Sequence, residues 1–419
     1  MKLKGKRLLV TGGANFADDI FEFTRAKGIV VITTGTTHNR IMELADEVYS
    51  VDTSNYEELL KLAEEKRIDG IFAGGNEPNI VTAIRVSEKL NLPYYCNMAQ
   101  WDALMNKANF KHLCRQFGIP VTKEFDIHTI EDVEKCEVEY PVIVKPVDSC
   151  GSKGVTFCSD LDELKKAVED ALRFSASQKV IVEQYVTGEE ISATYTICNG
   201  NITLSCIKEK YPVAEQTGLM NMPNVFIYPS KHLDQYVEEI NDRAIEMLKS
   251  LNLQFGSLFL QGFVNPSGIY MFEAGFRPGG TNDFRYTDMM NGVNQMHLLI
   301  EQALTGEVDD NPNERDNPRF RQYCCSFTMC ARGGKVYKID GLKEIEGISQ
   351  IKSIEQFYHE SDSIPDGKTL AQRMLRYFII ADSLNEVEDV INKIQDNVTV
   401  TNEKGESILY SRFDTKRLY

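Results

Sequence analysis

The chain has 419 residues, of which 42% are hydrophobic and 26% are charged, a composition typical of a globular protein with about two to four domains. Its formal net charge of −16, from 46 basic and 62 acidic residues, argues against a surface that binds nucleic acid or an anionic membrane. No apolar run approaches the roughly 20 residues that span a bilayer, and the N-terminus lacks a signal-peptide core, so we expect a cytoplasmic protein.

The first hundred residues alternate between buried strands and amphipathic helices. Strands are indicated by KRLLVTGG, IVVITTG and GIFAGG, and helices by ADDIFEFTRAKG, YEELLKLAEEKRID and NIVTAIRVSEKLNLP. This order predicts a doubly wound parallel sheet over residues 1–100. An NAD site is not expected, because TGGANFA departs from the Gly-x-Gly-x-x-Gly pattern and the second strand ends without an acidic residue.

The loop GGNEPN continues the third of these strands at the carboxyl edge of the predicted sheet. Sheets of this kind bind ligands beyond that edge, so Asn76 and Glu77 are candidate substrate contacts. An ordinary polar loop is the alternative interpretation.

The pattern changes after residue 100. We expect a helix within 101–120, strands around one helix between 121 and 210, a helix over 231–254, and a strand pair around the turn Asn-Pro-Ser-Gly. A helix over 291–306 precedes an acidic, proline-bearing segment that marks a boundary before the tail. The predicted fold class is therefore α/β and α+β, with domains at 1–100, 101–310 and 311–419.

The segment KPVDSCGSKGV, residues 145–155, places a lysine, two hydroxyls and two glycines between apolar stretches. Glycine lets backbone N–H groups approach a ligand, and Lys145 supplies positive charge. The loop with Ser149, Gly151, Ser152 and Gly154 is therefore a candidate phosphate site. A turn with a solvated lysine is the alternative.

Other charged residues extend this set. Lys107 lies in the helix that opens the second region, and the strand KVIVEQ carries Glu183 with Glu190 seven residues later. Two lysines can neutralise the negative charge of a polyphosphate. The backbone edge of the strand beyond Glu183 can bind an adenine, and Glu190 can accept hydrogen bonds from a ribose. The oxygens of Gln261 and Glu273, on the strand pair, suit magnesium.

The register of that strand pair decides whether the metal assignment is possible. With a four-residue turn, Gln261 would face Phe272, and Glu273 would point to the other side of the sheet. Both side chains reach one ion only if the hairpin gains a residue, so we expect a bulge at Gly268 or a loop of odd length.

Two further patterns do not indicate a site. The ten cysteines contain no Cys-x-x-Cys pair, which favours reduced thiols over disulfides or zinc. The segment DGKTL ends like a P-loop, but Asp362 stands where the leading glycine would be, so a turn is expected.

The order of these motifs resembles the ATP-grasp superfamily of carboxylate–amine and carboxylate–thiol ligases, over about residues 5 to 310. The pattern is most similar to the L-amino-acid ligase and carbamoyl-phosphate-synthase-like branches, and the tail GGKVYKIDGLKEIEGISQI resembles the C-terminal part of the former. The resemblance implies a two-subdomain ATP-grasp fold with a lid at about 121–185, preceded by the βαβ domain and followed by a small α+β domain.

The resemblance also implies a role for each candidate residue. Lys107 and Lys145 would contact the ATP phosphates beneath the loop Ser149–Gly154, while Glu183 and Val186 would frame the adenine through backbone groups. Glu190 would hold the ribose, Phe263 or Phe272 would lie against the base, and Gln261 and Glu273 would ligate magnesium. Arg277, with Lys145, would act in catalysis, and Asn76, Glu77, Asn282 and Arg285 would bind the acid substrate.

Two positions depart from the family pattern. Gln261 stands where members often have an acid, and Gly275 stands where an asparagine usually follows the metal-binding glutamate by two residues. Asp283 is a candidate to complete the second metal site.

The implied activity joins a small carboxylic acid, for example an amino acid, to an amine through an acyl phosphate, with release of ADP and phosphate. ATP and Mg²⁺ are the implied cofactors, and the expected partners are the small-molecule carboxylate and amine, without nucleic acid or membrane; a homodimer is compatible with this. Two alternatives stay open: a carboxylating or carbamoyl-phosphate-type enzyme on the same fold, and a nucleotide-binding regulatory protein without catalysis.

Overall fold

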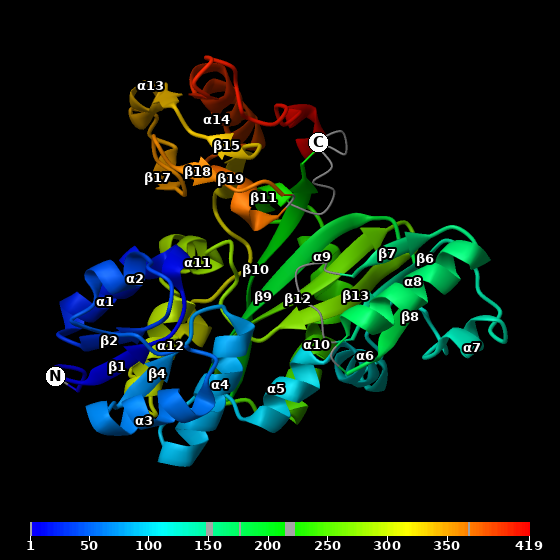
Figure 1. Cartoon of the computed structure of the whole chain (residues 1–419), viewed down its shortest axis with the longest axis horizontal. Coiled ribbons are helices and arrows are strands. Elements are labelled where there is room, and N and C mark those ends of the chain that lie inside the picture. The colour runs from blue at the N-terminus through cyan, green and yellow to red at the C-terminus, as the bar shows by residue number, and fades with distance from the viewer. Residues whose placement is uncertain (1, 148–153, 176, 214–222, 368) are drawn as a thin grey trace. The chain divides into compact units, whose positions relative to one another are not determined.

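The structure is a computed structural model that describes residues 2–147, 154–175, 177–213, 223–367 and 369–419 (Figure 1). The chain forms two compact units. The first contains Met1–Gly188, Ala193–Ser205 and Asp234–Asn317, and the second contains Glu189–Ser192, Cys206–Leu233 and Pro318–Tyr419. Strands β9 (Glu189–Cys198) and β10 (Asn201–Pro212) each have residues in both units.

The first unit begins with a four-stranded parallel sheet in the order β3-β2-β1-β4 (Figure 1). Its strands are β1 (Arg7–Val10), β2 (Val30–Thr34), β3 (Glu47–Tyr49) and β4 (Gly70–Phe72). The helices between and after them are α1 (Ala17–Lys27), α2 (Arg40–Leu44), α3 (Tyr56–Lys66) and α4 (Glu77–Leu90). The apolar runs read from the sequence are the buried strands, so the predicted parallel sheet is confirmed.

Glycines let the loops after β1 and β4 approach each other closely. A Cβ atom on Gly12 would lie 2.2 Å from the carbonyl oxygen of Ala73, and Gly74 has a left-handed backbone with a φ of +60°. The TGG turn of the sequence therefore serves backbone packing at this sheet edge.

The expected helix within 101–120 is two helices, α5 (Met98–Met105) and α6 (Lys107–Gln116). Asn106 separates them because its backbone is extended, and its side chain accepts hydrogen bonds from the N–H groups of Ala108 and Asn109 at 3.1 and 3.2 Å. Lys107 is thereby the first residue of a capped helix.

A second, four-stranded sheet of the first unit has the order β5-β8-β6-β7. It contains β5 (Glu124–Phe125), β8 (Val180–Gln184), β6 (Val142–Pro146) and β7 (Thr156–Cys158), all antiparallel. Helices α7 (Ile130–Val133) and α8 (Leu161–Phe174) belong to the same layer, and α8 lies along the sheet (Figure 1). Its core includes Val142, Val144, Leu164, Val168 and Val182.

The rest of the first unit contains the hairpin of β12 (Phe255–Asn265) and β13 (Gly268–Gly275). The helices are α9 (Leu233–Tyr236), which continues through a π-helical turn at Val237–Asn241 into α10 (Asp242–Ser250), then α11 (Asp283–Asn291) and α12 (Gln295–Thr305). Helix α12 starts four residues later than expected, because Gly292 ends α11 and Asn294 caps α12.

The second unit is an α+β layer whose antiparallel strands run in the order β10-β11-β14-β19-β17. Besides the part of β10 from Cys206 onward, these strands are β11 (Pro223–Tyr228), β14 (Tyr323–Cys330), β19 (Arg373–Ala381) and β17 (Ile351–Gln356). The unit also contains helices α13 (Leu342–Glu346) and α14 (Leu384–Asn397). Two further antiparallel sheets have two short strands each. One pairs β15 (Gly334–Lys335) with β18 (Ser363–Ile364), and the other pairs β16 (Lys338–Asp340) with β20 (Thr399–Thr401). Its core includes Phe327, Ile379, Val390, Ile391 and Ile394.

The parallel N-terminal sheet, together with the large antiparallel strands, confirms the predicted α/β and α+β class. No helix of the described residues has the length and hydropathy that a membrane span requires. The cysteines in the same ranges carry free thiols, and all of them except Cys136 are buried.

Candidate functional site

A buried carboxylate lies at the centre of the lysine cluster in the first unit. Glu183 on β8 is nearly inaccessible, and its Oε1 forms an ion pair with Lys145 of β6. Its Oε2 lies 2.7 Å from the Nζ of Lys111 and accepts a 2.5 Å hydrogen bond from the hydroxyl of Thr122. Each carboxylate oxygen therefore faces a different lysine.

Lys111 comes from the buried face of α6, one turn after Lys107, and its side chain is 0% exposed. Its Nζ donates to the Thr122 hydroxyl at 2.8 Å and lies 3.2 Å from an oxygen of Glu124. Glu124 stands directly opposite Glu183 in the β5–β8 pairing, so Lys111 bridges two facing carboxylates.

The charges of this cluster hold one another in their ionised forms. Burial acts to raise the pKa of Glu183, but Lys145 and Lys111 outweigh it and bring the pKa below the usual value of 4.5. Burial lowers the pKa of Lys111, an effect that the neighbouring carboxylates oppose. The cluster is a buried ion network rather than a set of solvated charges.

Lys107 contacts the strand that carries the predicted metal ligand. Its Nζ lies 3.3 Å from Oε1 of Glu273 on β13. The start of α6 and the β12–β13 hairpin therefore bring together a candidate phosphate-binding cation and a candidate magnesium-binding carboxylate.

The β12–β13 hairpin is irregular, as the register argument required, and Gln261 stands directly opposite Glu273. The expected position of the irregularity was wrong, because Val264 pairs with Ile269 and Asn265 with Gly268 in regular succession. The register shifts after Gln261, where Gly262 pairs with Met271 and Phe272 is the extra residue.

The strands are crowded beside the bulge at Phe272. A Cβ atom on Gly262 would lie 2.7 Å from Sδ of Met271 and 3.0 Å from the carbonyl oxygen of Tyr270, so a glycine is needed where the strands crowd together. The Phe272 ring stacks on that of Phe263, with centroids 4.7 Å apart. The two aromatic candidates for the adenine wall therefore form one surface.

Gly275 gives a physical reason for the departure from the family pattern. It pairs with Phe259, and a Cβ atom at this position would lie 2.0 Å from the tip of the Phe259 ring. The guanidinium of Arg277 lies over the same ring, 5.2 Å from its centroid. The aromatic ring thus occupies the space that an asparagine side chain at position 275 would need.

Asp283 is buried at the start of α11 and accepts hydrogen bonds from the hydroxyls of Thr194 at 3.1 Å and Thr281 at 2.5 Å. Within the described residues, no group of three or more His, Cys, Asp or Glu side chains has the arrangement of a metal centre. Gln261 and Glu273 together supply two oxygen-bearing side chains, the ligand chemistry that magnesium prefers.

The predicted acid-binding residues lie in two ion pairs. Nε and Nη2 of Arg277 lie 3.1 and 3.0 Å from one oxygen of Glu77. Arg285 binds both oxygens of Asp19, at 2.9 and 2.6 Å. The Arg277–Glu77 pair shows that the loop after β4 and the segment after β13 are neighbours. The same two segments approach each other at Gly75, where a Cβ atom would lie 3.1 Å from the carbonyl oxygen of Pro278.

The remaining substrate candidates have structural contacts. Asn76 caps α4 by accepting a 3.2 Å hydrogen bond from the N–H of Asn79. Asn282 is buried with a left-handed backbone, and the side chain of Asn15 donates to it at 3.4 Å.

The other predicted nucleotide contacts come from other elements of the chain. Glu190 belongs to the second unit, where it pairs with Lys210. Val186 is half-buried between β8 and β9, and Gly154, with a φ of +74°, precedes β7. Ser149, Gly151 and Ser152 lie outside the described residues.

Sequence reasoning missed Lys111, Thr122 and Asp19. A usable signal existed for Lys111, because a lysine on the buried face of an amphipathic helix, beside Phe110 and Cys114, needs an internal partner. Neither Thr122 nor Asp19 stands in a pattern that points to its partner, since each contact joins residues far apart in the chain.

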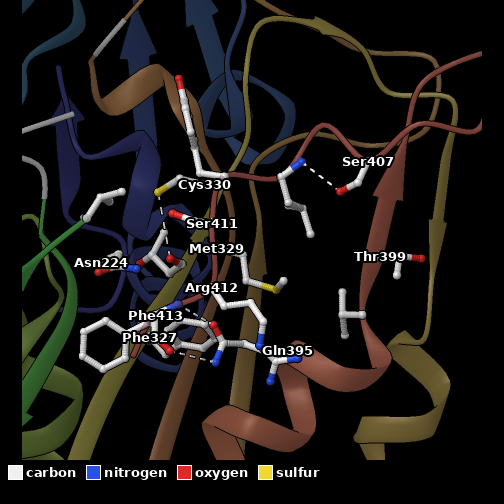
Figure 2. Close-up of a pocket in the computed structure, with 15 residues that line it drawn as sticks. Asn224, Phe327, Met329, Cys330, Gln395, Thr399, Ser407, Ser411, Arg412 and Phe413 are labelled. Atoms are coloured by element: carbon white, nitrogen blue, oxygen red, sulfur yellow. Dashed lines mark hydrogen bonds between the residues drawn. The ribbon is translucent and has the colours of Figure 1, made fainter. Parts of the chain in front are cut away.

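The second unit contains a cavity of about 170 Å³, drawn in Figure 2. Phe327, Met329 and Phe413 form apolar parts of its lining, and Gln395 and Asn224 form polar parts. The side chain of Gln395 forms two hydrogen bonds with the backbone of Phe413. Its oxygen accepts from the N–H of Phe413 at 2.7 Å, and its amide nitrogen donates to the carbonyl of Phe413 at 3.3 Å. Among the described residues, none of those predicted to bind ATP, metal or substrate lines this cavity.

Comparisons with known proteins find similarity to several ligases and synthases. Residues 102–302 match the family model described as D-ala D-ala ligase C-terminus. The carbamoyl phosphate synthase large chain of Clostridium acetobutylicum is 24% identical over 297 residues, which cover 67% of this chain and 26% of that protein. The chain thus spans about a quarter of the length of such curated relatives.

Two solved structures match nearly the whole chain. L-amino acid ligase from Bacillus licheniformis has a TM-score of 0.79 at 20% identity, covering 96% of this chain and 99% of that one. Phosphoribosylglycinamide synthetase from Anaerococcus prevotii has a TM-score of 0.77 at 17% identity, covering 96% and 100%. At these identities the two structures establish the shared fold.

Proposed function

We propose that this chain, which belongs to the ATP-grasp superfamily of ligase-type enzymes, activates a small carboxylic acid as an acyl phosphate and joins it to an amine. The observation that carries the proposal is the contact of Lys107 with Glu273, which stands opposite Gln261. A cation and two oxygen-bearing side chains at one point suit a phosphate chain with its metal ion.

Gln261 and Glu273 fit magnesium by their chemistry, because both offer oxygen and the bulge places them opposite each other. When bound there, the ion would neutralise charge on the phosphates. Lys107 and Lys145 would contact the phosphates from the protein side, with Lys145 acting in catalysis as well. Glu183 and Val186 would frame the adenine, Glu190 would hold the ribose, and the Phe263–Phe272 stack would cover the base.

The proposed reaction proceeds in two steps. A carboxylate oxygen of the acid attacks the γ-phosphorus of ATP, so that an acyl phosphate forms and ADP leaves. The amine nitrogen then attacks the acyl carbon, loses a proton, and displaces phosphate. The protein itself forms no covalent bond in either step, and its residues act by orienting the reactants and by stabilising developing charge.

The ion pairs Arg277–Glu77 and Arg285–Asp19 support an amino acid as the activated acid. Each pair presents a guanidinium beside a carboxylate, which complements a ligand that carries both an ammonium and a carboxylate group. In this proposal Arg277 and Arg285 bind or stabilise the acid, with Asn76, Glu77 and Asn282 around it. Residues 101–310 form the ATP-grasp domain, between domains at 1–100 and 311–419.

The test is a screen for phosphate release from ATP with pairs of amino acids and amines. The expected result is ADP and phosphate, formed only when a carboxylate substrate is present. AMP and pyrophosphate as the main products would overturn the acyl-phosphate route.

The likeness to carbamoyl phosphate synthase over 297 residues favours one second candidate, a carbamoyl-phosphate-type activity with bicarbonate as the acid. ATP cleavage that depends on bicarbonate and not on any amino acid would select it. Nucleotide binding without cleavage under every condition would instead indicate a regulatory protein.

A further inference from the structure

Five charged side chains form a continuous row through the first unit. Arg115 pairs with Glu124, Lys111 lies between Glu124 and Glu183, and Glu183 pairs with Lys145. The row runs from α6 across β5 and β8 to β6. Three cations and two carboxylates leave one net positive charge.

The two lysines that flank Glu183 differ in their access to a ligand. The Lys111 side chain is 0% exposed, whereas that of Lys145 is 12% exposed. Lys111 cannot reach a molecule outside the fold, and its ammonium is held by Glu183, Glu124 and the hydroxyl of Thr122. A ligand would therefore meet Lys145 and not Lys111.

Glu183 alone would cancel the charge of Lys145. A buried carboxylate in direct contact with an ammonium forms a neutral pair, and a neutral pair attracts an anion weakly. Lys111 on the opposite oxygen restores a net charge of +1 to the three groups. The short, buried contacts keep this arrangement fixed before any ligand arrives.

We propose that Lys111 is a positioning residue that neutralises Glu183 from inside the fold, so that the charge of Lys145 stays available to the phosphates of a nucleotide. The inference rests on the proposed function, in which Lys145 contacts ATP. It assigns to Lys111 an effect on nucleotide affinity without any contact to the nucleotide.

The experiment compares four chains: the unaltered protein, Lys111→Met, Glu183→Gln and the double variant. The probe is ADP with magnesium, titrated calorimetrically at fixed salt, and thermal unfolding is recorded for each chain. Lys166→Met is the control, because Lys166 is an exposed lysine on α8 of the same unit outside this row.

Electrostatic compensation predicts that the two single substitutions change ADP affinity in opposite directions and that their effects cancel in the double variant. Lys111→Met should weaken ADP binding by about ten- to thirtyfold, the effect of one unit charge at about 8 Å in a protein-like dielectric. Glu183→Gln should bind ADP about tenfold more tightly than the unaltered chain, because it removes one negative charge beside Lys145. The double variant, which again has a net charge of +1, should bind within about threefold of the unaltered chain, and Lys166→Met should not differ from it.

A merely structural role for Lys111 gives the opposite order, because the double variant would then bind more weakly than either single variant. That result, or equal affinity of Lys111→Met and the unaltered chain, would overturn the inference. If Lys111→Met does not fold, the inference can still be tested by comparing Glu183→Gln with the double variant. These two chains differ only in the Lys111 charge, so the double variant should bind ADP about tenfold more weakly than Glu183→Gln. No ADP binding by the unaltered chain would overturn the proposed function itself, and the inference with it.

Discussion

Replacement of Gly275 by asparagine would restore the family's usual residue at a place where the structure has no room for it. A Cβ atom there would lie 2.0 Å from one atom of the Phe259 ring and 2.5 Å from two others. Contacts this short require the ring to leave the face of the β12–β13 hairpin, where it pairs with Gly275 and lies beneath Arg277.

Overpacking of this kind destabilises proteins by about 1–3 kcal/mol. We expect Gly275→Asn to lie near the upper end of that range, because the clash is with a rigid ring. A loss of about 3 kcal/mol corresponds to a fall in melting temperature of roughly 6–12 °C for a cooperative unit of about 150–250 residues.

The assay is thermal unfolding of Gly275→Asn, Phe259→Ala and the double variant. The double variant should be at least about 1 kcal/mol more stable than the sum of the single effects, because removal of the ring opens the space that asparagine needs. Gly347→Asn is a suitable control, since a Cβ atom there would meet nothing within 4 Å and the backbone φ is −80°. Unchanged stability of Gly275→Asn would refute this account of why the asparagine is missing.

Three further predictions concern the candidate site. Lys145→Ala should reduce turnover by about 10²–10³, as does the loss of a preorganised charge-stabilising group elsewhere, and a loss below about threefold in steady-state assays would remove Lys145 from the site. Because the pKa of Glu183 is lowered in the folded protein, its contribution to stability should be present above pH 4.5 and disappear as the pH falls through the folded pKa. Glu183→Gln should therefore flatten the acid limb of a stability-against-pH curve, and an unchanged limb would contradict the assignment. Gln261→Glu should tighten magnesium binding, measured by titration of nucleotide-dependent activity, because a carboxylate replaces a neutral ligand; weaker binding would place Gln261 outside the metal site.

The sequence was most informative where one local pattern determined the structure. The parallel sheet of residues 1–100 follows from buried strand runs that alternate with helical periodicity, and no distant contact is needed to predict it. The hairpin was predicted in part. Period-two alternation showed that Gln261 and Glu273 could meet only across an irregularity, but its position depends on crowding between Gly262 and Met271, which single-strand periodicity does not encode.

The candidate site was less predictable because its contacts join distant segments. Lys111 meets Glu183 across 72 positions of sequence, and Arg285 meets Asp19 across 266. Glu190 lies only seven residues after Glu183, but it belongs to the other compact unit and pairs there with Lys210. Pairing of this kind is determined by tertiary structure, which a single sequence does not display.

The long stretch of chain between the paired strands β11 and β14 has a consequence for synthesis on the ribosome. Strand β11 ends at Tyr228, and its partner β14 begins at Tyr323, so the partner is translated about 95 residues later. At about 5–20 residues per second, the free edge of β11 waits roughly 5–20 seconds for the strand that covers it. An uncovered strand edge is a template for pairing with other chains, so during this interval the edge of β11 exposes the nascent protein to aggregation.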